Sequence, residues 1–203
     1  MSGTVLVDYG MGNLRSVQKA FELNGEKPVI SSSARDVEKA QKIILPGVGA
    51  FTHAMHELKK RRLVAPLKEK IKAGTPYLGL CLGLQLLFSW SEEGERVKGF
   101  DIIEGPVKRF LAGNLKIPHM GWNTVKFSKK NCPIIKNVAD GSYFYFVHSY
   151  FGKPEDPSWA LGTTRYGKDF CSAVWKGNVF ATQFHPEKSQ TVGQRVIKNF
   201  VRL

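Results

Sequence analysis

The sequence predicts an α/β fold in which helices flank a mainly parallel, open β-sheet. In the first half of the chain, short apolar segments alternate with amphipathic segments of helical spacing, a pattern typical of parallel sheets. In the second half, strand-like segments follow one another and are separated by Gly and Pro rather than by helices. We expect these later strands to extend the same sheet in antiparallel fashion. At 203 residues, the chain is expected to form one domain over 1–203.

Four strands are predicted in the first half, each followed by at least one helix. Asn13 can cap the first helix, and Gly25 can end it. Pro46 ends the third strand, and Gly74 ends the helix before the fourth. The expected strands are 4–8, 27–30, 42–46 and 76–80, and the expected helices are 14–24, 34–40, 51–60, 64–73 and 83–90. Six further strands are expected at 101–110, 123–127, 143–147, 159–165, 171–176 and 178–184, with a last helix from about 191 onward.

The net charge of +13 raises the question of a nucleic-acid partner. It arises from 30 Lys and Arg against 17 Asp and Glu, and the basic residues are spread along the chain. The densest basic cluster, 59–62, has no aromatic residues interleaved for base stacking. We therefore expect a solvated basic surface, or one that meets an acidic protein, and no nucleic-acid partner.

Membrane, metal and disulfide proteins are disfavoured by the composition. The sequence has no apolar run of 18 residues and no signal-peptide pattern at its start, so we expect no membrane association and a cytosolic location. The three cysteines, Cys81, Cys132 and Cys171, are odd in number, widely spaced and without a C-x-x-C pair. This pattern argues against a metal site or a disulfide framework, but it leaves room for one nucleophilic cysteine.

The segment "GLCLGLQ" (79–85) places Cys81 between two glycines, where a predicted strand becomes a helix. A residue at such a turn lies at the carboxyl edge of the sheet, where open α/β folds place their sites. The glycines allow a sharp bend and a close approach of substrate, and the positive end of the following helix favours a thiolate. The backbone N–H of Leu82 would point towards a developing oxyanion. Taken alone, the segment fits a buried turn cysteine as well as a nucleophile.

A nucleophilic cysteine needs a base, and the candidate is His185 in "TQFHPEKS". Pro186 excludes a helix and favours extended geometry at His185, which places Glu187 on the same side, about 6.6 Å along the chain. The carboxylate can then fix the imidazole tautomer and support its positive charge. For "FHPE" alone a surface His-Pro turn is the better interpretation. Beside the cysteine turn, a Cys-His-Glu triad is favoured.

The segment "LPGVGAF" (45–51) ends another predicted strand at the same edge. Gly47 and Gly49 are separated by one residue and leave backbone amides accessible to an anion or oxyanion. No G-x-x-x-x-G-K-[ST] pattern follows, so a phosphate loop is not indicated. An ordinary strand-ending turn is the alternative.

With "PGVG", "GLCLGLQ" and "HPE" in this order, the chain resembles the class I (triad) glutamine amidotransferase family over nearly its whole length. The resemblance implies a flavodoxin-like core and hydrolysis of glutamine to glutamate and ammonia without a cofactor. It assigns Cys81 as the nucleophile, His185 as the general base and acid, and Glu187 as the residue that orients His185. The oxyanion-hole amides would be those of Gly49 and Leu82. The residues implied to hold the glutamine substrate are Gly47, Gln85, Glu93, His148, Ser149 and Tyr150.

Within the family, "VDYGMGNLRS", "PHMGWN" and "HPEKS" are similar to segments of the glutaminase subunits that act in histidine biosynthesis. The resemblance implies a heterodimer with a separate cyclase subunit, a (β/α)8 barrel. That subunit uses the ammonia to form imidazole glycerol phosphate and an aminoimidazole carboxamide ribotide. The implied partner-facing positions are Asn13, Met120, Trp122, Tyr145 and Lys188. Trp, Tyr and Met are enriched in interface cores, although Trp122 and Tyr145 fit ordinary core positions equally well.

Two other functions share part of this pattern. A glutaminase subunit of another ammonia-channelling synthase, such as pyridoxal phosphate synthase, would carry the same triad, but "PHMGWN" argues against it. A non-catalytic subunit that has kept the fold would not need all three of Cys81, His185 and Glu187. The sequence therefore favours an enzyme.

Overall fold

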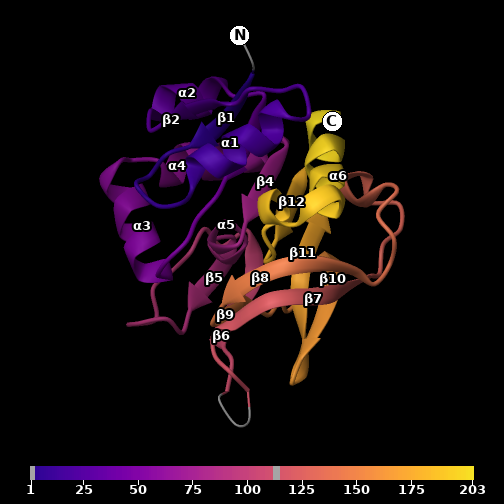
Figure 1. The fold of residues 1–203 in the computed structure, drawn as a ribbon. Helices are drawn as coiled ribbons and strands as arrows, with labels where there is room; N and C mark the ends of the chain where they lie inside the picture. The colour runs from indigo at the N-terminus through magenta and orange to yellow at the C-terminus, as the bar shows by residue number, and fades with distance from the viewer. Residues whose placement is uncertain (1–2, 112–114) are drawn as a thin grey trace.

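A computed structural model describes residues 3–111 and 115–203 and arranges their strands in two sheets (Figure 1). The larger sheet has nine strands in the order β2-β1-β3-β4-β12-β11-β10-β7-β8. Its parallel part consists of β2 (Val29–Ser31), β1 (Thr4–Val7), β3 (Lys42–Leu45), β4 (Tyr77–Leu80) and β12 (Val179–Thr182). The predicted parallel first half is confirmed, but β12 differs from the expectation because it joins β4 in parallel rather than antiparallel register.

The rest of the larger sheet is antiparallel, as predicted. It contains β11 (Lys168–Lys176), β10 (Ala160–Tyr166), β7 (His119–Phe127) and β8 (Ser142–His148). The strand predicted at 123–127 begins four residues earlier, because β7 stays paired with β8 as far as His119 opposite His148. This extension brings the "PHMGWN" segment alongside the end of β8.

A second, three-stranded sheet was not expected. It consists of β5 (Phe88–Ser91), β6 (Ile103–Arg109) and β9 (Tyr150–Gly152). The prediction of a helix over 83–90 is therefore wrong, and so is the placing of 101–110 in the larger sheet. The helix stops early because the chain at Phe100 and Ile102 donates backbone hydrogen bonds to the carbonyls of Leu86 and Leu87.

Helices cover both faces of the larger sheet, as predicted. One face carries α1 (Leu14–Glu22) and α6 (Gln190–Val201), and the other carries α2 (Ala34–Lys39), α3 (Phe51–Lys60) and α4 (Val64–Lys72). α5 (Leu82–Gln85) is a single short turn after β4. Within the described residues, no helix has the length and apolar character needed to cross a membrane.

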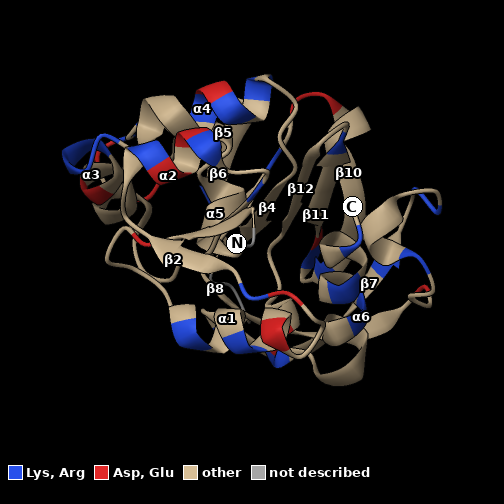
Figure 2. Ribbon diagram, turned by 90° about the horizontal axis from the view of Figure 1, so that it is seen from above, with Lys and Arg blue, Asp and Glu red and all other residues tan. Residues whose placement is uncertain are grey.

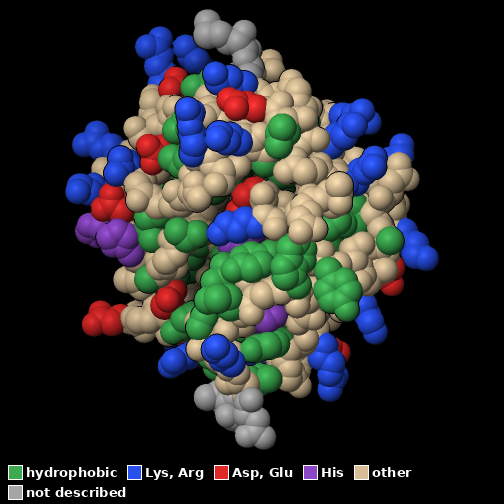
Figure 3. All heavy atoms as spheres, in the orientation of Figure 1, with side chains coloured by type: hydrophobic (Ala, Val, Ile, Leu, Met, Phe, Trp, Pro, Cys, Tyr) green, Lys and Arg blue, Asp and Glu red, His purple; other side chains and the backbone are tan. Residues whose placement is uncertain are grey.

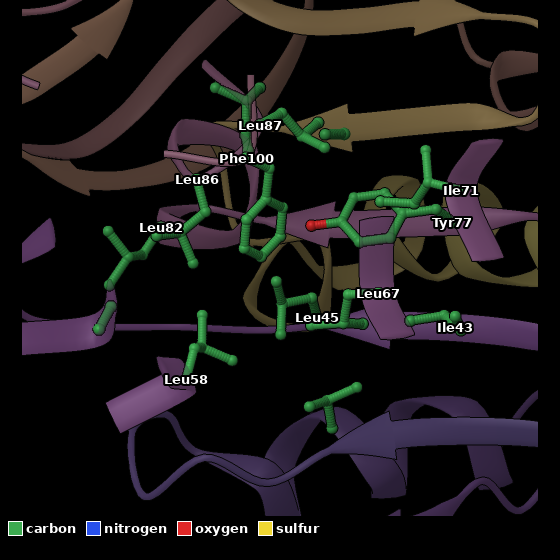
Figure 4. Close-up of a cluster of buried hydrophobic side chains, with 14 of the residues drawn as sticks. Ile43, Leu45, Leu58, Leu67, Ile71, Tyr77, Leu82, Leu86, Leu87 and Phe100 are labelled. Atoms are coloured by element: carbon green, nitrogen blue, oxygen red, sulfur yellow. The ribbon is translucent and has the colours of Figure 1, made fainter. Parts of the chain in front are cut away.

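The core follows from the alternation of side chains along the strands. In β3, Ile44 packs with the α1 and α6 layer, whereas Ile43 and Leu45 pack with the α3 and α4 layer. Figure 4 shows the cluster on the α3 and α4 side, in which Leu58 and Leu67 from these helices lie together with side chains from β3. Full burial of each such leucine contributes about 2 kcal/mol to stability.

The excess positive charge is distributed over several elements. Figure 2 shows Lys and Arg on α1, α2, α3, α4 and α6, with acidic residues among them. The basic residues of the described chain are therefore spread over the surface and do not form a single basic stripe.

Candidate active site

The site lies where three neighbouring parallel strands end. β3, β4 and β12 are adjacent in the larger sheet, and their C-terminal ends lead to Gly47, Cys81 and His185 respectively. Because parallel strands end at the same edge, the three segments singled out from the sequence meet there. Thr182, the last residue of β12, pairs with Leu80, the last residue of β4, so the two strands end at the same level.

Cys81 occupies a strained turn between β4 and α5. Its backbone has φ 52° and ψ −102°, in the left-handed half of the map that non-glycine residues seldom adopt. The Cys81 N–H donates to the carbonyl of Thr182 at 2.7 Å, which fixes the turn against β12. The residue is 6% exposed. Because α5 has only four residues, its macrodipole is smaller than the predicted helix would have provided.

The glycines on either side of Cys81 allow backbone to pack on backbone. A Cβ on Gly83 would lie 1.9 Å from the carbonyl oxygen of Leu45 in β3. A Cβ on Gly79 would lie 2.5 Å from the carbonyl oxygen of Gly83. The buried Tyr77 hydroxyl donates to that same Gly83 oxygen at 2.8 Å. The turn is therefore held against its neighbours with no room for side chains at either glycine.

His185 and Glu187 form a buried pair. The Nδ1 atom of His185 lies 2.8 Å from Oε1 of Glu187, and both side chains are 3% exposed. The contact is reached differently from the prediction: Pro186 starts a 3₁₀ turn (Pro186–Lys188) after an extended His185, so the carboxylate folds back over the ring. Burial opposes protonation of His185, but the negative charge of Cys81 and the Glu187 carboxylate outweigh it and raise the pKa of His185 to about 10. The arrangement favours the protonated, imidazolium form of His185.

The amide expected to bind an oxyanion is engaged by another group. The Leu82 N–H donates to the Gly47 carbonyl at 3.4 Å. Gly49 has φ +94°, a conformation that suits glycine. An oxyanion can use the Leu82 amide only after the Gly47 carbonyl has turned away.

A pocket of about 500 Å³ opens beside Cys81. Eight of the residues predicted from the sequence line it, namely Gly49, Cys81, Leu82, Gln85, Glu93, His148, Ser149 and Tyr150. Gly47 does not. It lines a separate cavity of about 10 Å³ together with Asn13, His185, Glu187 and Lys188. The structure thus places the larger pocket on the thiol side and the smaller cavity on the imidazole side.

Two of the pocket residues have structural partners in addition to their predicted role. Glu93 accepts a hydrogen bond from the Phe51 N–H at 2.7 Å, which satisfies a free donor at the start of α3. Gln85 donates through Nε2 to the Tyr150 carbonyl at 2.9 Å. Both contacts fix the pocket wall to neighbouring elements.

The ring nitrogens of His148 are both engaged by neighbouring groups of the protein. Its Nδ1 donates to the Tyr150 carbonyl at 2.8 Å, and its Nε2 lies 2.9 Å from Nδ1 of His119. A carbonyl only accepts, so Nε2 of a neutral His148 must accept from His119, whose own Nε2 then accepts from Asn123 at 3.2 Å. Burial lowers the pKa of His148 to about 3 and that of His119 to about 4. Both rings are held neutral in fixed tautomers.

We expect this histidine pair to destabilise the protein in mild acid. Below the ordinary histidine pKa of about 6.5, these two histidines bind protons in the unfolded chain but stay neutral in the folded protein. The free energy of unfolding therefore decreases as the pH falls. Each ring contributes a slope of up to about 1.4 kcal/mol per pH unit. Urea unfolding between pH 7 and pH 5 measures the slope. His119→Phe should reduce it by about half; an unchanged slope in this variant would contradict the assignment.

The five predicted partner-facing residues lie near the face of the molecule that carries β7 and β8. Met120 and Trp122 are 62% and 47% exposed, so a core position for Trp122 is ruled out. The Trp122 and Tyr145 rings lie 6.2 Å apart, and the Lys188 ammonium lies 5.8 Å from the Tyr145 ring centre. Asn13 caps α1 by accepting from the Ser16 N–H, as predicted. Figure 3 shows hydrophobic side chains gathered over this part of the molecule, over β7 and β8.

One polar residue of the site was missed by the sequence reasoning. Gln183 is fully buried, and its Nε2 lies 3.5 Å from the sulfur of Cys81. Its position two residues before His185 in an extended run was the available signal, because alternate residues share a face. Across residues 3–111 and 115–203, no group of three or more His, Cys, Asp or Glu is arranged to hold a metal ion.

Comparisons with known proteins agree with the geometry. The family model for glutamine amidotransferase class-I matches residues 5–203. The chain is 49% identical over 202 residues to the imidazole glycerol phosphate synthase subunit HisH of Syntrophotalea carbinolica, covering 97% of this chain and 98% of the relative. It is 47% identical over 206 residues to the protein of the same name from Geobacter sulfurreducens, covering 98% of each. A crystal structure of a glutamine amidotransferase aligns with a TM-score of 0.77 at 17% identity, covering 99% of this chain and 98% of that chain, and has the same fold.

Proposed function

The chain belongs to the class I glutamine amidotransferase family, and from this premise we propose that it is the glutaminase subunit of an imidazole glycerol phosphate synthase. The observation that carries the proposal is an identity of 47% to 49% over nearly the whole chain to subunits of that name. In this role the chain hydrolyses glutamine to glutamate and ammonia. The ammonia passes to a cyclase subunit, which we propose to be a (β/α)8 barrel.

The first half of the proposed reaction is acylation of Cys81. The thiolate attacks the side-chain amide carbon of glutamine, and a C–S bond forms as the carbonyl oxygen takes up negative charge. Backbone amides of Leu82 and Gly49 hold that oxygen once the Gly47 carbonyl has moved. His185, charged and buried beside Glu187, gives its proton to the departing nitrogen as the C–N bond breaks.

The second half releases glutamate. Neutral His185 takes a proton from water, and the resulting hydroxide attacks the thioester carbon. The C–S bond breaks, and the thiolate and the protonated imidazole are restored. Nδ1 of His185 carries a proton and donates it in a hydrogen bond to the Glu187 carboxylate. Nε2 is therefore the nitrogen that is left to exchange protons with the reacting groups. This nitrogen is buried, and Cys81 is the group whose thiol interacts with the His185 ring besides Glu187.

The substrate is proposed to occupy the pocket beside Cys81. Gln85, Glu93 and residues 148–150 form its walls, and the carboxylate of Glu93 suits the α-ammonium group of an amino acid. Gly47 is proposed to contribute from the other side of the turn.

The test of the function is glutamate release in the presence of a partner. We expect the chain mixed with the cyclase subunit of imidazole glycerol phosphate synthase to release more glutamate than the chain alone. The synthase subunit of pyridoxal phosphate synthase serves as the comparison. Stimulation by that subunit and not by the cyclase would overturn the proposed pathway, and no glutamate release with either would overturn the proposed enzyme.

The partner surface is proposed to include Asn13, Met120, Trp122, Tyr145 and Lys188. Exposed aromatic and methionine side chains in one patch are typical of interface cores. The net charge of +13 favours an acidic face on the partner.

We expect Trp122→Ala to weaken cyclase binding by about 30-fold, equivalent to about 2 kcal/mol, because tryptophan dominates many interfaces. Isothermal titration calorimetry of the two subunits measures the change. Leu23→Ala is the matched control, since Leu23 is 79% exposed at the far end of α1. Equal affinities of the Trp122→Ala and Leu23→Ala variants would remove Trp122 from the interface.

A further inference from the structure

We propose that Gln183 is a fourth residue of the catalytic centre, where its side-chain amide donates a hydrogen bond to the sulfur of Cys81 and stabilises the thiolate. The inference rests on the proposed function, because it assigns a role in the same reaction. The Nε2 atom of Gln183 lies 3.5 Å from Sγ of Cys81, within reach of a hydrogen bond to sulfur. The side chain is completely buried, so water cannot replace this donor.

The sheet brings Gln183 to the thiol. β12 and β4 are parallel neighbours with Thr182 opposite Leu80, so the next residue of each strand, Gln183 and Cys81, emerge side by side. The backbone of each is pinned, because the Cys81 N–H donates to the Thr182 carbonyl and the Gln183 N–H donates to the Ser172 carbonyl at 2.9 Å. The side chains therefore meet at a fixed separation.

The orientation of the Gln183 amide is set by a chain of contacts that ends in a carbonyl. The Tyr150 carbonyl can only accept, so the Gln85 group at 2.9 Å from it must be the NH₂ group. The same NH₂ group lies 3.1 Å from Gln183 and donates to its oxygen, Oε1. Once Oε1 faces Gln85, the NH₂ group of Gln183 must face Cys81. The hydrogen bonds from Gln85 to Tyr150 and to Gln183 therefore determine that the Gln183 amide faces the sulfur with its NH₂ group.

The anchor of this chain is itself held. The Tyr150 carbonyl also accepts from Nδ1 of His148, and His148 is fixed in turn by His119. Because the Tyr150 carbonyl accepts from both His148 and Gln85, its orientation is fixed. The amide that faces the thiol is thus supported from β9, outside the strands that carry the triad.

The chemical consequence concerns the charged form of sulfur. A hydrogen bond from a neutral amide to an anion is stronger than one to a neutral thiol, so it favours the thiolate before attack and after deacylation. Gln183 stabilises the negative charge on the Cys81 sulfur from one side, and protonated His185 stabilises it from another. It takes no part in proton transfer, because an amide neither gains nor loses a proton near neutral pH.

The experiment measures alkylation of Cys81 by iodoacetamide against pH, which reports the thiolate without any glutamine chemistry. We expect Gln183→Leu and the isosteric Gln183→Glu to slow alkylation at pH 7 by about tenfold while leaving the rate at high pH unchanged. Mass spectrometry assigns the label to Cys81. Burial raises the pKa of Cys132 and of Cys171 to about 12, so these thiols stay unreactive at pH 7. In the complex with the cyclase, kcat should fall about tenfold with little change in KM.

The matched control is Gln18→Leu, which replaces another buried glutamine whose amide donates to the Pro28 carbonyl. It should leave the alkylation profile unchanged. A Gln183→Glu variant with wild-type unfolding midpoint and a wild-type alkylation profile overturns the role of Gln183. A wild-type chain that alkylates normally but releases no glutamate with the cyclase overturns the proposed function instead, so the two failures are distinct.

Discussion

Replacing Cys81 with alanine is expected to reduce glutamine-dependent synthesis in the complex by at least about 1,000-fold. Cys81 is the pocket residue whose thiol interacts with the His185 imidazole, so without its sulfur the proposed acyl intermediate cannot form. Synthesis from added ammonium salt should continue at the wild-type rate, because the cyclase then receives ammonia from solution. The measurement is product formation with glutamine and with ammonium, each at saturating concentration.

The control for this substitution is Cys171→Ala, which removes a thiol outside the pocket. It should leave both rates unchanged. If Cys81→Ala still releases glutamate at the normal rate, Cys81 is not the nucleophile. If the ammonium-dependent rate falls as well, the substitution has damaged the complex and not the chemistry alone.

Gly83→Ala is expected to destabilise the protein by about 3 kcal/mol or more. The added Cβ would lie 1.9 Å from the carbonyl oxygen of Leu45 and 3.0 Å from its carbonyl carbon. Leu45 belongs to β3, which is paired on both sides, so this backbone cannot withdraw without breaking the sheet. Urea unfolding followed by circular dichroism measures the loss.

A glycine in open space provides the comparison. Gly177→Ala introduces a side chain at φ +57° with nothing within 4 Å, so only backbone strain of about 1 kcal/mol is expected. A Gly83→Ala protein as stable as the Gly177→Ala protein would show that the contact with β3 is not as tight as the structure indicates.

Much of the fold could be predicted because the first half obeys local rules. The parallel strands and their helices were located within a few residues, since each apolar segment has its own cap, glycine or proline at its end. The segment "LLFSW" could not be assigned, because a short apolar run fits a buried helix and a strand equally well. Its strand β5 forms by pairing with β6, a contact that no local pattern encodes.

The site was predictable to the extent that it depends on strand ends. Cys81, His185 and Glu187 are brought together because β4 and β12 are neighbours, but their parallel pairing was not apparent from the sequence. The route from His185 to Glu187 was also mistaken, since a 3₁₀ turn replaces the expected extended run. Gln183 was missed because its significance lies in an amide direction imposed from Tyr150, far away in the chain.

The central place of β12 has a consequence for how the protein is made. A ribosome delivers β4 about a hundred residues before β12, so a growing chain holds the Cys81 turn while the sheet beside it still has an open edge. Pairing across such a separation is slow, because closing a long loop precedes any gain from contacts. On the proposed function, an unfinished chain therefore carries a nucleophile without its base. Release of ammonia cannot begin until residues 179–187 have been synthesised and inserted between β4 and β11.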